Sequence, residues 1–403
     1  MDGVVKFGMT LICFGISILT AKFISRHHLF SFLKLRQGRY GSIDGLRGFL
    51  AISVLFHHFI ITWYWKASGK WTRPPEDYYQ NYGKVSVAIF FAITGFLFVS
   101  KILKDSGKIN WIEFYESRIF RIYPLYIFAM LIVTIIVFSS SFKLEVSLGQ
   151  IVKGYTQWLT FYYPGGIVNN FLDTKLVIAG VDWTLRYEWL FYIFLPIITI
   201  AIIRLGRVGG LFLFTVCVYL FNKPMQIDSM DTSFSIFFAI GGLSAYLNRR
   251  YKIPNSIIKS KLVSSLAALA IAFAIFRPIT FDSVHVVMIS LFFIPIVLGN
   301  DLFGVFSLKS SILLGEISYS IYLLHGIVIY LAFSVLKIAV LKNISLQEYL
   351  IFMPVMCVAV ILISALTFIS IEKPSIDFGR TYPISRMLRS AAINAKKLLQ
   401  RAS

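Results

Sequence analysis

Residues Ser42 to Phe59 read SIDGLRGFLAISVLFHHF, and this stretch combines an apolar run with charged and imidazole side chains. The apolar part continues to residue 65, which gives roughly the 20 residues that an α-helix needs to cross a bilayer. A charged group at membrane depth costs about 2.5 to 3.5 kcal/mol, so a span that keeps one is expected to use it. The stretch therefore predicts a transmembrane helix that carries functional groups.

The whole chain has the composition of an integral membrane protein. Of its 403 residues, 57% are hydrophobic and 14% are charged, a balance too apolar for a soluble globular protein. We therefore predict an all-α polytopic membrane protein with about eleven transmembrane helices. The candidate spans lie near 3–24, 47–65, 85–103, 119–140, 183–203, 207–222, 232–248, 260–277, 283–299, 311–337 and 349–371.

The distribution of Lys and Arg predicts how the chain is oriented. Alternate loops, beginning with 25–46, hold 24 of the 39 Lys and Arg residues, while the other set, including the N-terminus, holds 12. Because basic loops stay in the cytoplasm, the N-terminus is expected outside and the C-terminus in the cytoplasm. The first span has no small-residue cleavage site behind it, so we interpret it as a retained helix.

The net charge of +20 does not point to nucleic acid in a chain of this kind. The basic tail at 379–403, which begins with Arg380, follows the last span, where Lys and Arg bind anionic lipid headgroups. The three cysteines, Cys13, Cys217 and Cys357, fall inside predicted spans with unrelated spacings. Neither a disulfide nor a metal site is therefore expected.

The longest outer segment, 141–182, contains TQWLTFYYPGG from Thr156 to Gly166. Its aromatic residues and its Pro-Gly break are typical of a helix lying at the membrane interface or of a re-entrant loop. A loop that only caps the bundle and a loop that binds an acceptor would have the same composition, so both interpretations stay open.

Arg47 and His58 share one face of the opening helix. They are eleven residues apart, and eleven steps of about 100° return to within about 20° of the start while rising about 16 Å. Arg47 is therefore expected at the cytoplasmic surface and His58 near the middle of the bilayer. A lone His58 would be interpreted as a polar cross-helix hydrogen bond; the Arg47 in register, preceded by Asp44, favours a functional role instead. For His57, which points about 100° away, the structural interpretation is favoured.

A second cationic group lies in FYESRIFRIYP, where Arg118 and Arg121 stand at i and i+3 at the cytoplasmic end of a span. Two guanidiniums on one helix face suit a phosphate or a carboxylate. Alone, the pair would be a snorkelling anchor. Together with Arg47 on the same side of the membrane, it predicts a binding site for a phosphorylated ligand.

The remaining polar residues of the spans are candidates for supporting roles. Glu188 lies inside VDWTLRYEWLFYIFLP, where it either pairs with another helix or orients an acceptor. His325 is expected to be a packed polar group in mid-span, near Tyr319. Glu372 is expected to face the cytoplasmic headgroups without a partner.

Motifs of soluble catalysis are missing from the sequence. It has no Gly-x-Ser-x-Gly elbow, no phosphate-binding Gly-x-x-x-x-Gly-Lys loop and no His-Glu-x-x-His pair. What remains is a histidine base in a membrane core with arginines on the cytoplasmic side. This combination fits acyl transfer from a large anionic donor, in which the base takes the proton of a hydroxyl.

At these residues the sequence resembles the acyltransferase family 3 of membrane O-acyltransferases, from about residue 40 to residue 378. SIDGLRGFLAISVLFHHF is similar to the family's opening helix with its Arg-x10-His motif, and RIFRIYPLY matches its Arg-x-x-Arg motif. DWTLRYEWLFYIFLP, LGEISYSIYLLH and IEKP follow in the family's order, and they place Glu188 and Glu372 on two of its acidic positions. Ile43 and Thr94 depart from it, since they stand where Leu and Ser are usual.

The resemblance implies a domain organisation and a reaction. Residues 1–39 would be an extra N-terminal helix with a basic cytoplasmic loop, 40–378 a ten-helix membrane domain and 379–403 a cytoplasmic tail. The family transfers an acyl group, usually acetyl from acetyl-CoA, to a hydroxyl of a surface glycan or its lipid-linked precursor. Arg47, Arg118 and Arg121 would then hold the donor's phosphates, with His58 as base or acyl relay, Glu188 also in the site, and no permanently bound cofactor.

Two competing functions remain. A lipid-linked glycan flippase or polymerase would also need a basic inner surface and outer aromatic residues. An ion-coupled transporter is disfavoured because Glu188 is nearly the only intramembrane carboxylate and inverted repeats are not evident.

Overall fold

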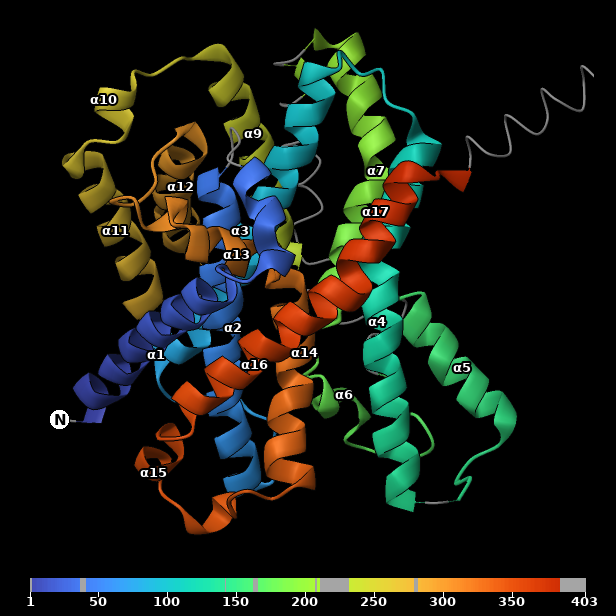
Figure 1. The fold of residues 1–403 in the computed structure, drawn as a ribbon. Helices are drawn as coiled ribbons and strands as arrows, with labels where there is room; N and C mark the ends of the chain where they lie inside the picture. Colours follow the sequence, from blue (N-terminus) through green and yellow to red (C-terminus); the bar gives the residue numbers. More distant parts are fainter. Residues whose placement is uncertain are drawn as a thin grey trace, which may run out of the picture.

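The computed structural model describes residues 2–36, 41–141, 143–161, 166–206, 209–210, 232–278 and 282–384. Helices and their connections make up these residues, with one isolated bridge between Val168 and Phe171, which confirms the all-α prediction (Figure 1). The α-helices are α1 (Asp2–Ile24), α2 (Gly41–Ser68), α3 (Asp77–Lys104), α4 (Trp111–Ser141), α5 (Leu148–Leu159), α6 (Thr174–Val177), α7 (Trp183–Arg204), α9 (Ile236–Arg250), α10 (Asn255–Ile258), α11 (Lys261–Phe276), α12 (Ser283–Leu298), α13 (Lys309–Glu316), α14 (Ser318–Tyr330), α15 (Leu346–Leu350), α16 (Met353–Thr367) and α17 (Lys373–Thr381). Short 3-10 helices cover His28–Arg36, Thr232–Ser235, Val305–Ser307 and Leu341–Asn343.

Seven helical stretches among the described residues are long and apolar enough to cross a membrane. They are Val5–Ile24, Gly41–Ser68, Asp77–Lys104, Trp111–Ser140, Trp183–Arg204, Ser318–Val335 and Leu346–Thr381, and α11 and α12 are shorter apolar helices. The chain is therefore a polytopic membrane protein. The number of eleven spans stays a prediction, since the span near 207–222 lies outside the described residues except for 209–210.

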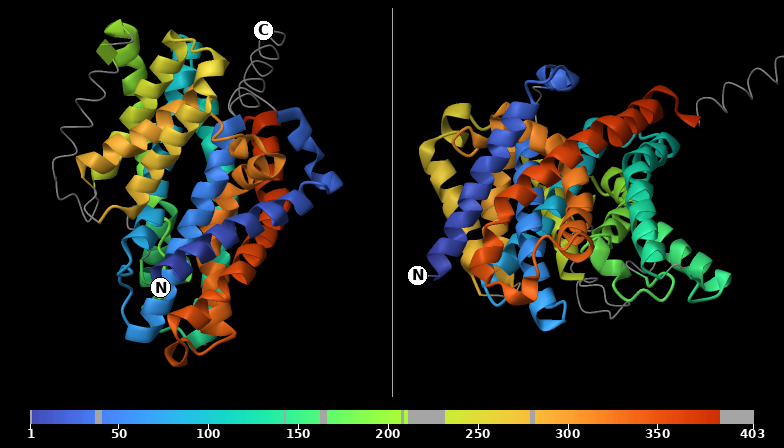
Figure 2. Two further views of the ribbon diagram at one scale, coloured as in Figure 1. Left: turned by 90° about the vertical axis from the view of Figure 1, so that its left-hand side faces the viewer. Right: turned by 60° about the horizontal axis from the view of Figure 1, so that its bottom comes forward.

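Helix α2 lies at the centre of the bundle. It packs against α3, α13 and α14, and α3 in turn packs against α9. The first helix, α1, lies against α16 (Figure 2). The sequence had indicated that Arg47 begins this helix. Because α2 begins at Gly41, Arg47 lies instead in its second turn.

Glycines allow α2 and α13 to approach each other closely. A Cβ atom added to Gly315 would lie 1.6 Å from the carbonyl oxygen of Asp44, and one added to Gly48 would lie 2.4 Å from the Cβ of Leu314. Small residues permit backbone contact of this kind between membrane helices. The close packing fixes the position of the helix turn that carries Arg47.

We expect the substitution Gly315→Ala to destabilise the protein by about 1 to 3 kcal/mol, because the methyl group forces the two backbones apart. The measurement is thermal unfolding of the purified chain in detergent. Gly15→Ala in α1 is the matched control, since nothing lies within 4 Å of its added Cβ. Equal unfolding temperatures for the two variants would show that α13 can shift without cost.

Two predicted spans depart from a continuous α-helix in the structure. The span predicted at 311–337 breaks at Ile317, which separates α13 from α14. The last span continues from α16 through a π-helical turn at Phe368–Glu372 into α17. A π-helical turn adds a residue to the helix and changes the direction of the side chains after it.

The outer segment contains a short helix beside α4. Helix α5 begins with a capping box formed by Ser147 and Gln150, and the hydroxyls of Thr134 and Tyr155 lie 2.8 Å apart between α4 and α5. The predicted interfacial segment Thr156–Gly166 begins inside this helix. Its residues 162–165 lie outside the described residues, so the re-entrant alternative stays open.

Candidate active site

A polar cavity of about 600 Å³ collects most of the predicted site residues. The three arginines Arg47, Arg118 and Arg121 line it together with Glu188, and the predicted supporting residues Asp44 and Tyr319 belong to the same lining. The other lining residues are Phe90, Ile93, Thr94, Leu97, Phe98, Ser117, Ile122, Tyr192, Glu316, Ile376 and Arg380. We call this space the arginine cavity.

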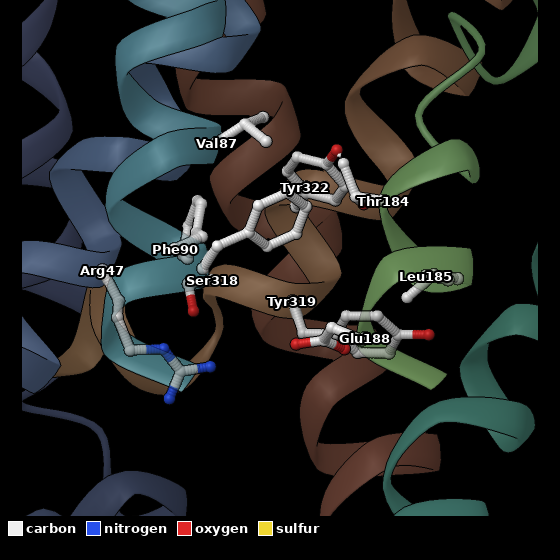
Figure 3. A pocket seen from close by; sticks show the side chains of 10 residues that line it. Arg47, Val87, Phe90, Thr184, Leu185, Glu188, Ser318, Tyr319 and Tyr322 are labelled. Atoms are coloured by element: carbon white, nitrogen blue, oxygen red, sulfur yellow. Dashed lines mark hydrogen bonds between the residues drawn. The ribbon is translucent and has the colours of Figure 1, made fainter. Parts of the chain in front are cut away.

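A smaller chamber of about 80 Å³ shares Arg47, Glu188 and Tyr319 with the arginine cavity. Figure 3 shows Arg47 on α2 at one side and Glu188 beside the ring of Tyr319 at the other. Thr184 and Tyr322 belong to the lining of the chamber but not to that of the cavity. The chamber therefore leads from the arginines towards the ring of Tyr322.

The two arginines of α4 are held in different ways. The Arg118 guanidinium lies 5.3 Å from the ring centre of Phe98, and its Nε–H donates to Ser117 at 3.3 Å. Arg121 forms an ion pair of 3.1 Å with Glu372. The positive charge of Arg121 is thus partly balanced within the protein.

Glu188 accepts a hydrogen bond from the hydroxyl of Thr94 on α3, at 3.4 Å. Thr94 was noted in the sequence as a departure from serine. Threonine keeps the hydroxyl donor that serine would supply, so the departure leaves this contact to Glu188 intact.

The expectation for Glu372 was wrong. Its side chain is fully buried and bound by Arg121 and by the Ser320 hydroxyl, which donates to Oε2 at 2.9 Å. The cause is the π-helical turn at Phe368–Glu372, which the sequence pattern did not reveal. A carboxylate removed from water in this way needs a charged or hydrogen-bonding partner, and it has both.

Replacing Glu372 with glutamine should destabilise the protein by about 1 to 3 kcal/mol. Removing one partner of a fully buried ion pair costs about 3 to 5 kcal/mol, but Arg121 is 24% exposed and can be hydrated in the cavity. Thermal unfolding of Glu372→Gln, Arg121→Gln and the double variant measures the coupling between the two side chains. The matched control is Lys373→Gln, whose partner Asp377 is 47% exposed. Additive effects of the two site variants would contradict the ion pair.

The histidines form a separate cluster. Nδ1 of His58 lies 2.8 Å from Nε2 of His325, which is fully buried on α14. His57 lies on another side of α2, where its Nδ1–H donates to the carbonyl oxygen of Tyr79 at 2.9 Å. This contact agrees with the structural role that the sequence favoured for His57.

His58 does not line either space. Tyr322, at the end of the small chamber, packs with its ring centre 6.2 Å from that of His325. The Trp71 ring, from the loop after α2, lies nearly parallel to the His58 ring at 6.3 Å. The structure thus places Tyr322 and His325 between the arginine cavity and His58, an arrangement that the helix register alone could not indicate.

Several lining residues were not identified from the sequence. Arg380 was assigned to the lipid-facing tail, whereas the structure places it in the lining of the arginine cavity. It reaches this position because α17 crosses α4, with Gly379 packed against the ring of Phe120. No local pattern marks that crossing, so the sequence offered no signal for it. Tyr322, in contrast, lies one turn before His325 in a motif that the sequence had already singled out.

The arrangement is suited to binding a large anion and to proton transfer at a distance from it. The cavity is lined by guanidinium groups from α2 (Arg47), α4 (Arg118 and Arg121) and α17 (Arg380). These groups supply donors for phosphate or carboxylate oxygens. The imidazole pair offers a ring nitrogen that can take a proton from a reacting hydroxyl. No cluster of three or more His, Cys, Asp or Glu residues that could hold a metal occurs within the described ranges.

Comparisons with known proteins show what the chain is similar to. A family model described as an acyltransferase domain, acyltransferase 3, matches residues 40–369. The chain is 24% identical over 316 residues to the O-acetyltransferase OatA of Staphylococcus aureus (strain NCTC 8325 / PS 47), which covers 70% of the chain and 49% of that protein. A putative O-acetyltransferase of Staphylococcus aureus (strain COL) is 24% identical over 331 residues, with coverage of 74% and 52%. The chain thus spans about half the length of these relatives, and no solved structure matches it.

Proposed function

Because the chain belongs to the acyltransferase 3 family, we propose that it is a membrane O-acyltransferase of surface polysaccharides. It moves an acetyl group from cytoplasmic acetyl-CoA to a hydroxyl of a cell-surface polysaccharide, of the lipopolysaccharide O-antigen type, or of its undecaprenyl-linked precursor. The names of the similar proteins, which are O-acetyltransferases, support acetyl as the acyl group.

The observation that carries the proposal is the arginine cavity. Arg47, Arg118 and Arg121 come from two helices and line one polar space, as a ligand with several phosphates requires. Along α2, His58 lies about 16 Å from Arg47, which is the scale of the pantetheine arm of CoA. The donor's phosphates would therefore lie in the cavity while its thioester extends towards the histidines.

His58 acts as the base or as an acyl relay, and the same site serves both. As base, it takes the proton of the acceptor hydroxyl while the hydroxyl oxygen attacks the thioester carbonyl. As relay, it carries the acyl group before the acceptor takes it. Glu188 lines the space between the arginines and Tyr322 and orients the reacting groups.

The enzyme would work in a bacterial inner membrane, with the N-terminus outside and the C-terminus in the cytoplasm. The basic loops support this orientation. Helix α2 begins at the end of the bundle that carries the arginines, so acetyl-CoA would enter from the cytoplasm.

Mass spectrometry of the surface polysaccharide from a deletion strain tests the proposal. Loss of an acetyl adduct that the restored gene returns is the expected result. Altered chain length with every acetyl adduct retained would contradict acetyl transfer and would indicate a polymerase or flippase.

A further inference from the structure

The contact between His58 and His325 fixes where the protons of both rings lie. Nδ1 of His325 lies 2.9 Å from the carbonyl oxygen of Ile321, one turn earlier on α14. A carbonyl oxygen can only accept a hydrogen bond, so the His325 Nδ1 must carry a proton. In a neutral ring, the other nitrogen, Nε2, then carries a lone pair.

The neutral state is the one that this position favours. His325 is fully buried in the centre of the bundle, and a charge without a counter-charge at such a depth is costly. The lone pair on its Nε2 faces Nδ1 of His58 at 2.8 Å. His58 must therefore donate from Nδ1, which leaves its own lone pair on Nε2.

We propose that His325 is a positioning residue that holds His58 in the tautomer whose Nε2 is the base. This assignment rests on the proposed role of His58 and goes beyond it, since it names the reacting nitrogen and the group that selects it. The carbonyl of Ile321, His325 and His58 form one directional chain of hydrogen bonds, which fixes the tautomer.

This chain of hydrogen bonds indicates which atoms hold the transferred proton during acyl transfer. The acceptor O–H bond breaks and its proton moves to Nε2 of His58, while the oxygen forms a bond to the thioester carbonyl carbon. The carbon–sulfur bond then breaks, and the thiolate takes the proton from Nε2, which restores the neutral ring. Throughout, Nδ1–H of His58 donates to His325, and this hydrogen bond strengthens when His58 is positively charged.

Nitrogen NMR of the full chain tests the tautomer without any substrate. The chain has six histidines, so labelling with ¹⁵N-histidine gives a small set of signals, and those of His58 are assigned by their loss in His58→Gln. The expected result is a His58 ring protonated at Nδ1 in the parent protein. A ring protonated at Nε2 would overturn the proposal.

Two substitutions of His325 separate positioning from packing. His325→Gln keeps an amide oxygen near the place of Nε2, where it can accept a hydrogen bond from His58. The shorter side chain of His325→Asn places its amide near the position of Nδ1 and leaves no acceptor near the position of Nε2. With acetyl-CoA and polysaccharide from the deletion strain, Gln should retain kcat within about tenfold, while Asn should lose about 10²- to 10⁴-fold. The KM for acetyl-CoA should stay within about twofold in both, because ground-state binding in the arginine cavity is untouched.

In the Asn variant the fraction of His58 protonated at Nε2 should rise, because free histidine favours that form and only the backbone carbonyl of Val54 then competes for the Nδ1 proton. Equal kcat values for the Gln and Asn variants would overturn the positioning role even if both fold. Failure of the proposed function gives a different pattern, since His58→Ala would then transfer acetyl at the parental rate whatever tautomer the spectra show.

Discussion

Replacing His58 with alanine is expected to lower kcat for acetyl transfer by about 10²- to 10⁴-fold, the usual contribution of a general base. The substitution removes the imidazole that takes the hydroxyl proton, but it leaves the arginine cavity unchanged, because His58 does not line it. The KM for acetyl-CoA should therefore change little. The assay uses purified chain in detergent, acetyl-CoA and polysaccharide from the deletion strain.

The neighbouring histidine supplies the control. His57→Asn keeps a donor for the carbonyl of Tyr79 and should transfer acetyl at close to the parental rate. Thermal unfolding of both variants shows whether they fold. A folded His58→Ala protein that is as active as the parent would remove His58 from the mechanism.

The double substitution Arg47→Gln and Arg118→Gln should weaken acetyl-CoA binding by about 100-fold or more. Each charge-assisted hydrogen bond contributes about 1.5 to 3 kcal/mol, and every 1.4 kcal/mol corresponds to about tenfold in Kd. These two arginines are chosen because Arg121 is already paired with Glu372. Calorimetric titration of acetyl-CoA into the purified chain measures the change.

Salt gives a second readout of the same contacts. Parental binding should weaken as ionic strength rises, and the double variant should show a shallower dependence, since fewer charges face the ligand. Arg250→Gln, at the exposed end of α9, is the matched control and should bind as the parent does. Undiminished affinity in the double variant would place the donor's phosphates outside the arginine cavity.

Much of the fold could be predicted because its signals are local. The apolar spans follow from composition, and the shared face of Arg47 and His58 follows from helix geometry. The grouping of Arg118 and Arg121 with Arg47 was inferred from their common side of the membrane, and all three line one cavity. Their role in binding stays a prediction.

The parts that could not be predicted depend on tertiary contacts. The burial of Glu372 requires a π-helical turn and the approach of Ser320 from α14. Arg380 enters the cavity only because α17 crosses α4. The pairing of His58 with His325 joins residues 267 positions apart. A single sequence does not show which residues so far apart come into contact. The break at Ile317 likewise divides a stretch, 311–337, that the sequence predicted as one span.

The position of Tyr322 bears on where the transmembrane voltage would fall across the protein. Its hydroxyl donates to the carbonyl oxygen of Val181 at 3.2 Å and lies 3.0 Å from the Thr184 hydroxyl, so the ring is held in place in the lining of the small chamber. If water and ions enter the arginine cavity, which holds about 600 Å³, they bring bulk conductivity into the bilayer from one side. The transmembrane voltage would then fall mainly across the layer of side chains around Tyr322 and the two histidines. A full charge that crosses this layer would gain or lose about 2.3 kcal/mol per 100 mV, so a step that moves charge there would respond to the membrane potential.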